Sequence, residues 1–251
     1  MIAYRFHHSI FGALAVMTFL ASPVIQASEL HDAVIAGDAA RVKAVLAGGA
    51  NVDEPDLNGP ALHLAVALGS EDVAKGLIDA GANLESIGEP ADSHPLHVAA
   101  RADQAKIAAL LLDRGAKVDA FDGEGRTPLM VAVVYARIGV AKALLSHGAD
   151  VMARDSIYGD TVLHYAVGND EEIVKEIVSL LLSSGADVNA KSTTGGQTPL
   201  FYAAIHGKLD MVKLLAASGA DLSVVDKKGD TALERANDAA KELLRSLGAK
   251  K

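Results

Sequence analysis

Histidine recurs at one position of a repeating pattern, and imidazole is a side chain that can do chemistry. It follows a leucine that has an alanine three residues further on, at His31, His63, His97 and His164. A row of imidazoles stacked repeat on repeat indicates a metal site or a metal-dependent enzyme. Met130 and Phe201 occupy the same position in two other repeats, which makes the row a poor ligand set. We therefore expect no bound metal.

Other catalytic patterns are missing from the sequence. It has no His-Glu-x-x-His zinc motif, no Gly-x-Ser-x-Gly nucleophile elbow, no Walker loop and no EF-hand loop. The absence of cysteine excludes disulfides, thiol nucleophiles and cysteine-based zinc sites. We expect a protein that is not an enzyme, with no catalytic residues and no cofactor.

Two short markers recur in phase along the chain. Leu-x-x-Ala begins at Leu30, Leu62, Leu96, Leu129, Leu163, Leu200 and Leu233. Gly-Ala begins at Gly49, Gly81, Gly115, Gly148, Gly185, Gly219 and Gly248. The leucines are 32 to 37 residues apart, and a period of this length is the signature of a repeat protein.

The fourth repeat shows what each marker does. Thr127 can cap a helix and Pro128 suits its first turn, so a first helix is expected there. Apolar periodicity predicts a second helix over residues 140–146, and Gly148 would end it with a positive φ. Residues 149–155 are too few for another helix and favour a protruding loop or hairpin.

These residues resemble the ankyrin repeats. The family pattern is G-x-T-P-L-H-x-A-A followed by G-A-D-V-N, and residues 159–166 read Gly-Asp-Thr-Val-Leu-His-Tyr-Ala, with Gly-Ala-Asp-Val-Asn at 185–189. The resemblance implies an all-α solenoid of about seven helix-loop-helix units with β-hairpin fingers and a concave binding face. It also implies that the repeated histidine is a structural hydrogen-bonding residue.

The markers divide the chain after its N-terminal segment into units. We expect an ankyrin-repeat domain over residues 28–251, with repeats at about 29–58, 59–91, 92–124, 125–158, 159–195 and 196–228, and a C-terminal cap at 229–251. The fifth unit has three extra residues within 168–172, expected as an acidic bulge between its helices. It is either a specificity element or a tolerated insertion, and surface insertions cost little.

The N-terminus has the order of a secretory signal. Arg5 precedes an apolar run at 10–21, and Ile25 and Ala27 suit the last positions before a cleavage site. We expect residues 1–27 to be a signal peptide cleaved after Ala27. The alternative is an uncleaved membrane anchor, but a spanning helix needs about 20 apolar residues. Export to a bacterial periplasm, or secretion, is the expected location, with no membrane contact after cleavage.

The charge balance limits the partners. The chain has 23 Lys and Arg against 32 Asp and Glu, a net charge of −9. Such a chain lacks the basic face that nucleic acids require. The acidic balance favours a protein partner with a basic surface, and we expect the chain itself to be a monomer.

Contact residues are expected on the fingers and on the ends of the first helices. Aromatic and arginine side chains are common interface anchors, and they gather in the third to fifth units. The predicted protein-binding residues are Arg101, Phe121, Glu124, Arg126, Tyr135, Arg154, Ile157, Tyr158, Lys191 and His206.

Three functions follow from this pattern. The first is a periplasmic, non-enzymatic protein-binding module. The exported bacterial ankyrin proteins that the chain resembles include ones linked to catalase and peroxide resistance, and immunity proteins that neutralise a delivered toxin. The second is a metal-dependent protein using the histidine row, and the third is a secreted effector acting in a host cell.

Overall fold

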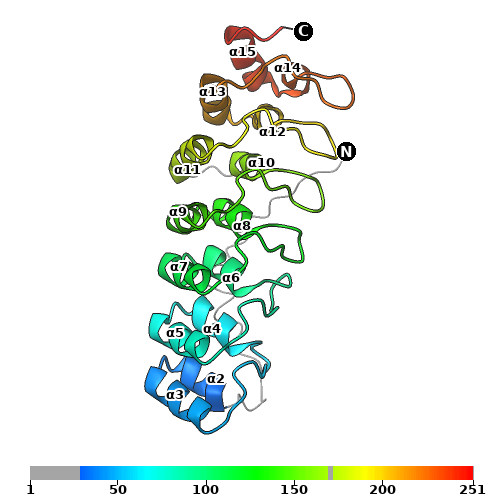
Figure 1. The fold of residues 1–251 in the computed structure, drawn as a ribbon. Coiled ribbons are helices and arrows are strands. Elements are labelled where there is room, and N and C mark those ends of the chain that lie inside the picture. Colours follow the sequence, from blue (N-terminus) through cyan, green and yellow to red (C-terminus); the bar gives the residue numbers. More distant parts are fainter. Residues whose placement is uncertain (1–28, 169–171, 251) are drawn as a thin grey trace.

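The computed structural model describes residues 29–168 and 172–250, which fold into a stack of helix pairs (Figure 1). The first helices of the seven pairs are α2 (Glu29–Ile35), α4 (Ala61–Ala67), α6 (Pro95–Arg101), α8 (Pro128–Val134), α10 (Val162–Val167), α12 (Pro199–His206) and α14 (Ala232–Arg235). The second helices are α3 (Ala39–Ala47), α5 (Glu71–Asp79), α7 (Ala105–Asp113), α9 (Ile138–Ser146), α11 (Glu172–Ser183), α13 (Leu209–Ala217) and α15 (Asp238–Ser246). This confirms an all-helical solenoid built from seven helix pairs.

Local sequence sets where each helix begins and ends. In the fourth repeat the Thr127 side chain accepts a hydrogen bond from the Met130 N–H, and Pro128 occupies the first turn of α8. Gly148 follows the end of α9 with a φ of 83°, a left-handed conformation that glycine adopts without strain. Helices of 7 and 9 residues are too short to be stable alone, so the stack depends on packing.

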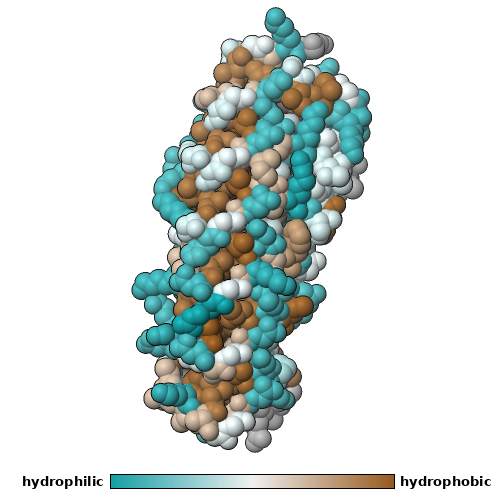
Figure 2. Space-filling model, viewed as in Figure 1, coloured by the Kyte–Doolittle hydropathy of each residue, from teal (hydrophilic) through white to brown (hydrophobic). Residues whose placement is uncertain are grey.

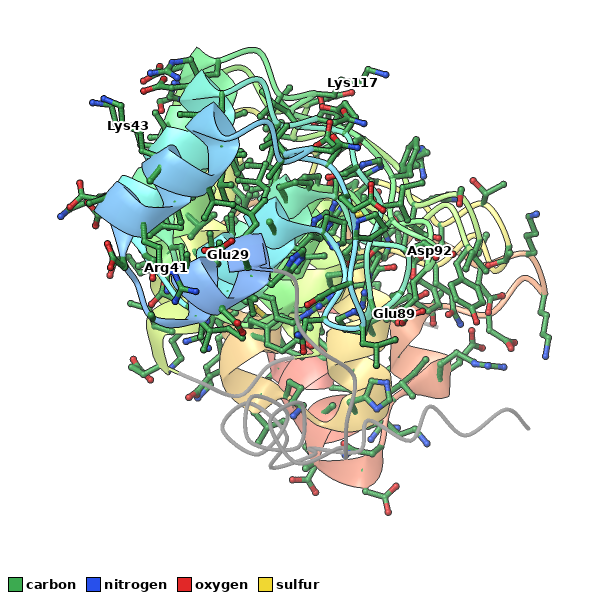
Figure 3. The ribbon with its side chains drawn as sticks, turned by 90° about the horizontal axis from the view of Figure 1, so that it is seen from below. Glu29, Arg41, Lys43, Glu89, Asp92 and Lys117 are labelled. Carbon is green, nitrogen blue, oxygen red and sulfur yellow. The ribbon has the colours of Figure 1, made fainter. Side chains whose placement is uncertain are left out.

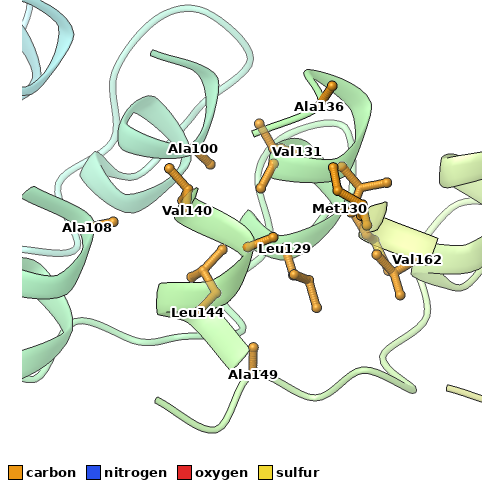
Figure 4. Close-up of a cluster of buried hydrophobic side chains, with 14 of the residues drawn as sticks. Ala100, Ala108, Leu129, Met130, Val131, Ala136, Val140, Leu144, Ala149 and Val162 are labelled. Atoms are coloured by element: carbon orange, nitrogen blue, oxygen red, sulfur yellow. The ribbon is translucent and has the colours of Figure 1, made fainter. Parts of the chain in front are cut away.

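The repeated leucine and alanine form the core. Leu129 and Leu144 are at most 1% exposed, and Ala132 is fully buried. Figure 4 shows this cluster, with Ala100 and Val162 contributed by the preceding and following repeats. Small residues let neighbouring helices approach closely, which explains why the alanine recurs in every repeat.

Each repeat packs on its immediate neighbours. The helix pairs with substantial contact all belong to one repeat or to two adjacent repeats, for example α6 with α8 and α7 with α9. Figure 2 shows the result on one face, where brown apolar residues alternate with teal polar residues along the whole stack. The architecture is therefore nearly one-dimensional.

Loops project from one side of the stack, and we call them fingers one to six (Figure 1). They comprise residues 53–59, 85–93, 119–126, 152–160, 189–197 and 223–230. The resemblance implies β-hairpin fingers, and that expectation is wrong: the described residues form no strand, only isolated bridges such as Arg154 with Thr161, so the alternative of a protruding loop holds. Side chains replace the missing ladder, because buried Asp155 accepts hydrogen bonds from the N–H groups of Ile157 and Tyr158 at 2.8 and 2.6 Å.

A row of side-chain acceptors connects the finger bases to the next repeat by hydrogen bonds. One acceptor per repeat binds a backbone N–H about thirty residues further on: Asp53 with Asn83, Glu85 with Lys117, Asp119 with Asp150, and Asn189 with Asp221, at 2.8 to 3.1 Å. In the fourth repeat the acceptor is the Met152 sulfur, 3.2 Å from the Asp187 nitrogen. Thioether sulfur is a weak acceptor, so this link is the weakest of the row.

The extra residues of the fifth repeat extend a helix. Helix α11 has 12 residues where the other complete second helices have 9. Its added first turn buries Val174 in the core. The expected bulge between the helices is therefore accommodated largely as helix, because an apolar residue at helical spacing gains burial there. Residues 169–171 lie outside the described residues.

The predicted signal peptide, residues 1–27, also lies outside the described residues. Among the residues that the structure describes, no helix is long and apolar enough to span a membrane.

Candidate functional site

The repeated histidines lie inside the stack. Each Nε2 donates a hydrogen bond to a backbone carbonyl of the following repeat. The accepting residue directly precedes the N-cap of that repeat's first helix. The pairs are His31 with Gly59 (2.9 Å), His63 with Ser93 (2.8 Å), His97 with Arg126 (3.0 Å) and His164 with Gln197 (3.0 Å). Within the described part of the chain no three potential ligands gather to hold a metal ion. The row therefore connects repeats.

Burial keeps two of these imidazoles neutral. It lowers the pKa of His97 and of His164 to about 4, against the smaller opposing effect of their carbonyl bonds. The Nδ1 atom of His164 accepts a hydrogen bond from the Thr161 N–H at 3.0 Å. A neutral ring that both donates and accepts suits a structural link between repeats.

A buried carboxylate lies at the base of finger four. Asp160 is 4% exposed, and the Tyr202 hydroxyl donates to its carboxylate at 2.9 Å. Burial raises the pKa of Asp160 to about 6, although the tyrosine hydrogen bond acts in the opposite direction. Because Asp160 belongs to the fifth repeat and Tyr202 to the sixth, the pair joins two repeats.

Two of the predicted contact residues come together at the ends of first helices. The Arg101 guanidinium lies 6.0 Å from the centre of the Tyr135 ring, at the outer range for a cation–π contact. Arg101 also donates to the Ser93 hydroxyl at 3.3 Å. Tyr135 remains exposed at the end of α8, so its ring is held in place and available to a partner.

Further along the stack, finger four meets finger five. Arg154 donates to the carbonyl oxygens of Gly159 and Lys191 at 2.7 and 2.6 Å. Beside it, Ile157 and Tyr158 are exposed at the tip of finger four. The arginine thus fixes the finger that presents them.

The remaining predicted residues have different surroundings. Arg126 has a side chain only 13% exposed, which pairs with Asp122 at 2.9 Å and Glu124 at 2.6 Å and so braces finger three. Phe121 is exposed on the same finger, and His206 is exposed at the end of α12. The ten predicted residues thus follow the finger side of the stack rather than forming one pocket.

Sequence reasoning missed two exposed apolar residues on the same side. Ile87 on finger two and Val225 on finger six are both more than 40% exposed. Ile87 lies six residues after Gly81, as Phe121 does after Gly115, so the Gly-Ala marker could have placed it on a finger. Val225 could have been found, because it holds the repeat position of Phe121, one residue before the finger's buried aspartate.

The fold and this surface define a class of protein, a helical repeat scaffold that presents an extended row of loops. The family model for ankyrin repeats in three copies matches residues 86–155, 122–192 and 163–251, and the single-repeat model matches residues 60–88. The chain belongs to the ankyrin-repeat family.

Solved structures and curated proteins share this architecture. The ankyrin repeat domain of Bcl-3, a member of the IkappaB family, has a TM-score of 0.79 and 31% identity, covering 88% of this chain and 100% of that chain. The human ASB11 ankyrin repeat domain gives a TM-score of 0.74 and 26% identity over 90% of this chain and 100% of that chain. The Danio rerio protein ZDHHC13 is 31% identical over 81% of this chain, which spans only 31% of that relative's length.

Proposed function

We propose that this chain is an exported, non-enzymatic module that holds a partner protein against its fingers and the ends of its first helices. One observation carries the proposal: large apolar side chains stand exposed on loops that are fixed at their bases. Leu57, Ile87, Phe121, Ile157, Tyr158 and Val225 are between 42% and 63% exposed. Repeated from finger to finger on one side of the stack, these side chains offer a partner protein apolar surface to bury.

The support for binding is preorganisation. Finger bases are held by buried aspartates and by bonds between fingers, as with Asp155 and Arg154. A surface that is already ordered loses little conformational freedom when a partner docks. The centre of contact in this proposal is the third to fifth repeats, where Tyr135 and Tyr158 provide aromatic anchors.

The compartment in this proposal is the periplasm. The order of residues before Ser28 supports export, and a cysteine-free fold needs no oxidation there. The partner is then a protein of the same compartment, such as a catalase of peroxide defence. A delivered toxin and a host protein are the alternative partners, and the identity of the captured protein separates the three.

The first experiment uses the full chain with a C-terminal tag, expressed in a Gram-negative bacterium and crosslinked before periplasmic extraction. We expect the tagged protein in the periplasmic fraction with Ser28 as its N-terminus, bound to one dominant protein. The Tyr135→Ala/Tyr158→Ala variant should fold normally and lose that protein. Recovery in the cytoplasm would contradict export, and normal binding by the variant would contradict the proposed contact centre.

A further inference from the structure

Charge changes sign along the row of fingers. Finger one exposes Asp53 and Glu54, and finger two exposes Glu89 and Asp92, with neither lysine nor arginine in either finger. The Asp56 side chain is only 9% exposed, and Glu85 is half-buried. Finger five carries Lys191 as its only charged residue, and finger six carries Lys227 and Lys228. The acidic end of the finger row thus lies at the N-terminal repeats and the basic end at the C-terminal repeats.

The acids of the last fingers do not cancel this difference at the surface. Asp155, Asp160 and Asp226 are buried and accept hydrogen bonds from backbone N–H groups or from a tyrosine. Half-buried Asp230 pairs with Arg235 at 3.5 Å. The charges that a partner would meet on fingers four to six are therefore those of Arg154, Lys191, Lys227 and Lys228.

The finger cations bind neutral partners. Arg154 donates to the Lys191 carbonyl, Lys191 to the Val225 carbonyl at 3.0 Å, and Lys227 to the Thr193 carbonyl. None of the three makes an ion pair with a carboxylate in the described part of the chain. Carbonyl bonds fix the position of these charges without neutralising them.

Charged residues on the second helices are arranged differently from those on the fingers. Lys106 of α7 pairs with Glu71 of α5 at 3.1 Å, and Lys142 of α9 pairs with Glu176 of α11 at 3.3 Å. Charges there are largely matched between neighbouring repeats, whereas on the fingers they are separated by sign. Viewed along the stack, Glu89 and Asp92 lie on the side opposite Lys43 of α3 (Figure 3). The charge separation therefore belongs to the surface that also exposes the apolar side chains.

We infer that the finger surface binds a partner protein whose contact strip is itself divided by charge. Basic side chains of the partner face fingers one and two, acidic side chains face fingers four to six, and apolar side chains contact the exposed row from Leu57 to Val225. The inference rests on the proposed function and specifies its partner. The net charge of −9 would favour a basic partner throughout, but that total includes the paired and buried acids.

Synthetic peptides test the inference without the natural partner. One peptide has Lys-Gly-Phe-Gly units in its first half and Glu-Gly-Phe-Gly units in its second half, and a second alternates the same units. We expect the full chain to bind the divided peptide at least about tenfold more tightly than the alternating one. The preference should disappear in about 1 M salt, where the screening length is about 3 Å. Equal affinity at low salt would overturn the inference.

A charge-conserving variant locates the effect. Glu89→Lys/Lys228→Glu weakens both ends of the pattern at constant net charge, and should reduce the preference for the divided peptide severalfold. The matched control, Lys43→Glu/Glu242→Lys, exchanges exposed charges on the second helices α3 and α15 and should leave it unchanged. An equal effect of both variants would overturn the inference.

Two further measurements separate this inference from the proposed function. If a partner captured from the periplasm binds the Glu89→Lys/Lys228→Glu variant normally, the binding module stands and the charge division fails. Sedimentation of the free chain tests a second copy as the occupant, since two finger rows could pair antiparallel. A dimer that Glu89→Lys alone weakens and Glu89→Lys/Lys228→Glu restores would overturn the inference in favour of self-association.

Discussion

The buried histidines make stability depend on pH. The pKa of His97 and of His164 is about 4 in the folded chain, against an ordinary value of about 6.5. Between these values the unfolded chain binds more protons, so each histidine removes about 1.4 kcal/mol of unfolding free energy per unit as the pH falls. We expect urea midpoints to fall from pH 7 to pH 4.5, and a constant midpoint would contradict the neutral state of these rings.

Asp160 acts in the opposite direction. Its pKa is raised to about 6 in the folded chain, so protonation of the folded state adds stability as the pH falls from 6 towards 4. Asp160→Asn removes this compensation and keeps an oxygen that can accept the Tyr202 hydrogen bond. We expect the variant to lose stability more steeply than the parent chain between pH 6 and pH 4.5. The same slope in both proteins would show that Asp160 does not titrate there.

Met152 allows a single link to be improved. At the same repeat position Asn189 accepts the Asp221 N–H at 2.8 Å, whereas the Met152 sulfur lies 3.2 Å from the Asp187 nitrogen. Met152→Asn should raise the unfolding free energy by about 0.5–1 kcal/mol, the usual net value of one hydrogen bond. The reverse change, Asn189→Met, should lower it by a similar amount in the same denaturation assay. Loss of stability in both variants would show that the acceptor is not the deciding feature.

At the scale of single residues, the sequence predicted the row of histidines and its interruptions. It did not predict their partners, because the carbonyls of Arg126 and Gln197 are about thirty residues away and only the packed repeats bring them near. The same holds for Arg126 itself. Arginine is a common interface anchor, but the Arg126 guanidinium forms an ion pair with buried Asp122, four residues before it.

A first helix carries residues that stabilise the fold, and the position just beyond its end carries a residue that we expect to bind the partner. Leu129 is buried in α8, and Tyr135 is exposed just beyond the end of the same helix. Leu129→Ala leaves a cavity and should cost about 2–5 kcal/mol, whereas Tyr135→Ala should cost little and weaken capture of the partner. Thermal unfolding and crosslinking of both variants test this. A large loss of stability in Tyr135→Ala would mean that its ring has a mainly structural role.

At the element scale, helix starts were predictable where the chemistry is local. Thr127 and Pro128 specify the start of α8, and Gly148 specifies the end of α9. The extra turn of α11 was not predictable from the count of residues, since an insertion before a helix and one within it give the same spacing. The structure distinguishes the two cases, because Val174 is buried in the added first turn of α11 and the insertion therefore lies within the helix.

The whole molecule is a chain of interfaces, so its ends need caps. Deleting residues 229–251 would remove α14 and α15 and expose the core side of α12, including buried Leu200 and Phe201. We expect a large fall in the denaturation midpoint and aggregation on heating, because terminal repeats shield the stack from water. Unchanged stability would show that the last pair contributes little to the fold.

The histidine row and the row of finger-base acceptors are both weakened at the interface between the fourth and fifth repeats. Met130 replaces the histidine that would connect the fourth repeat to the fifth, and Met152 provides sulfur where the other repeats provide oxygen. Pulled from its two ends in an optical trap, the stack should therefore part first between these repeats. The rupture would separate residues 29–158 and residues 159–250 as two blocks, and the first long extension step would come when one of these blocks unfolds, so that its length identifies the block.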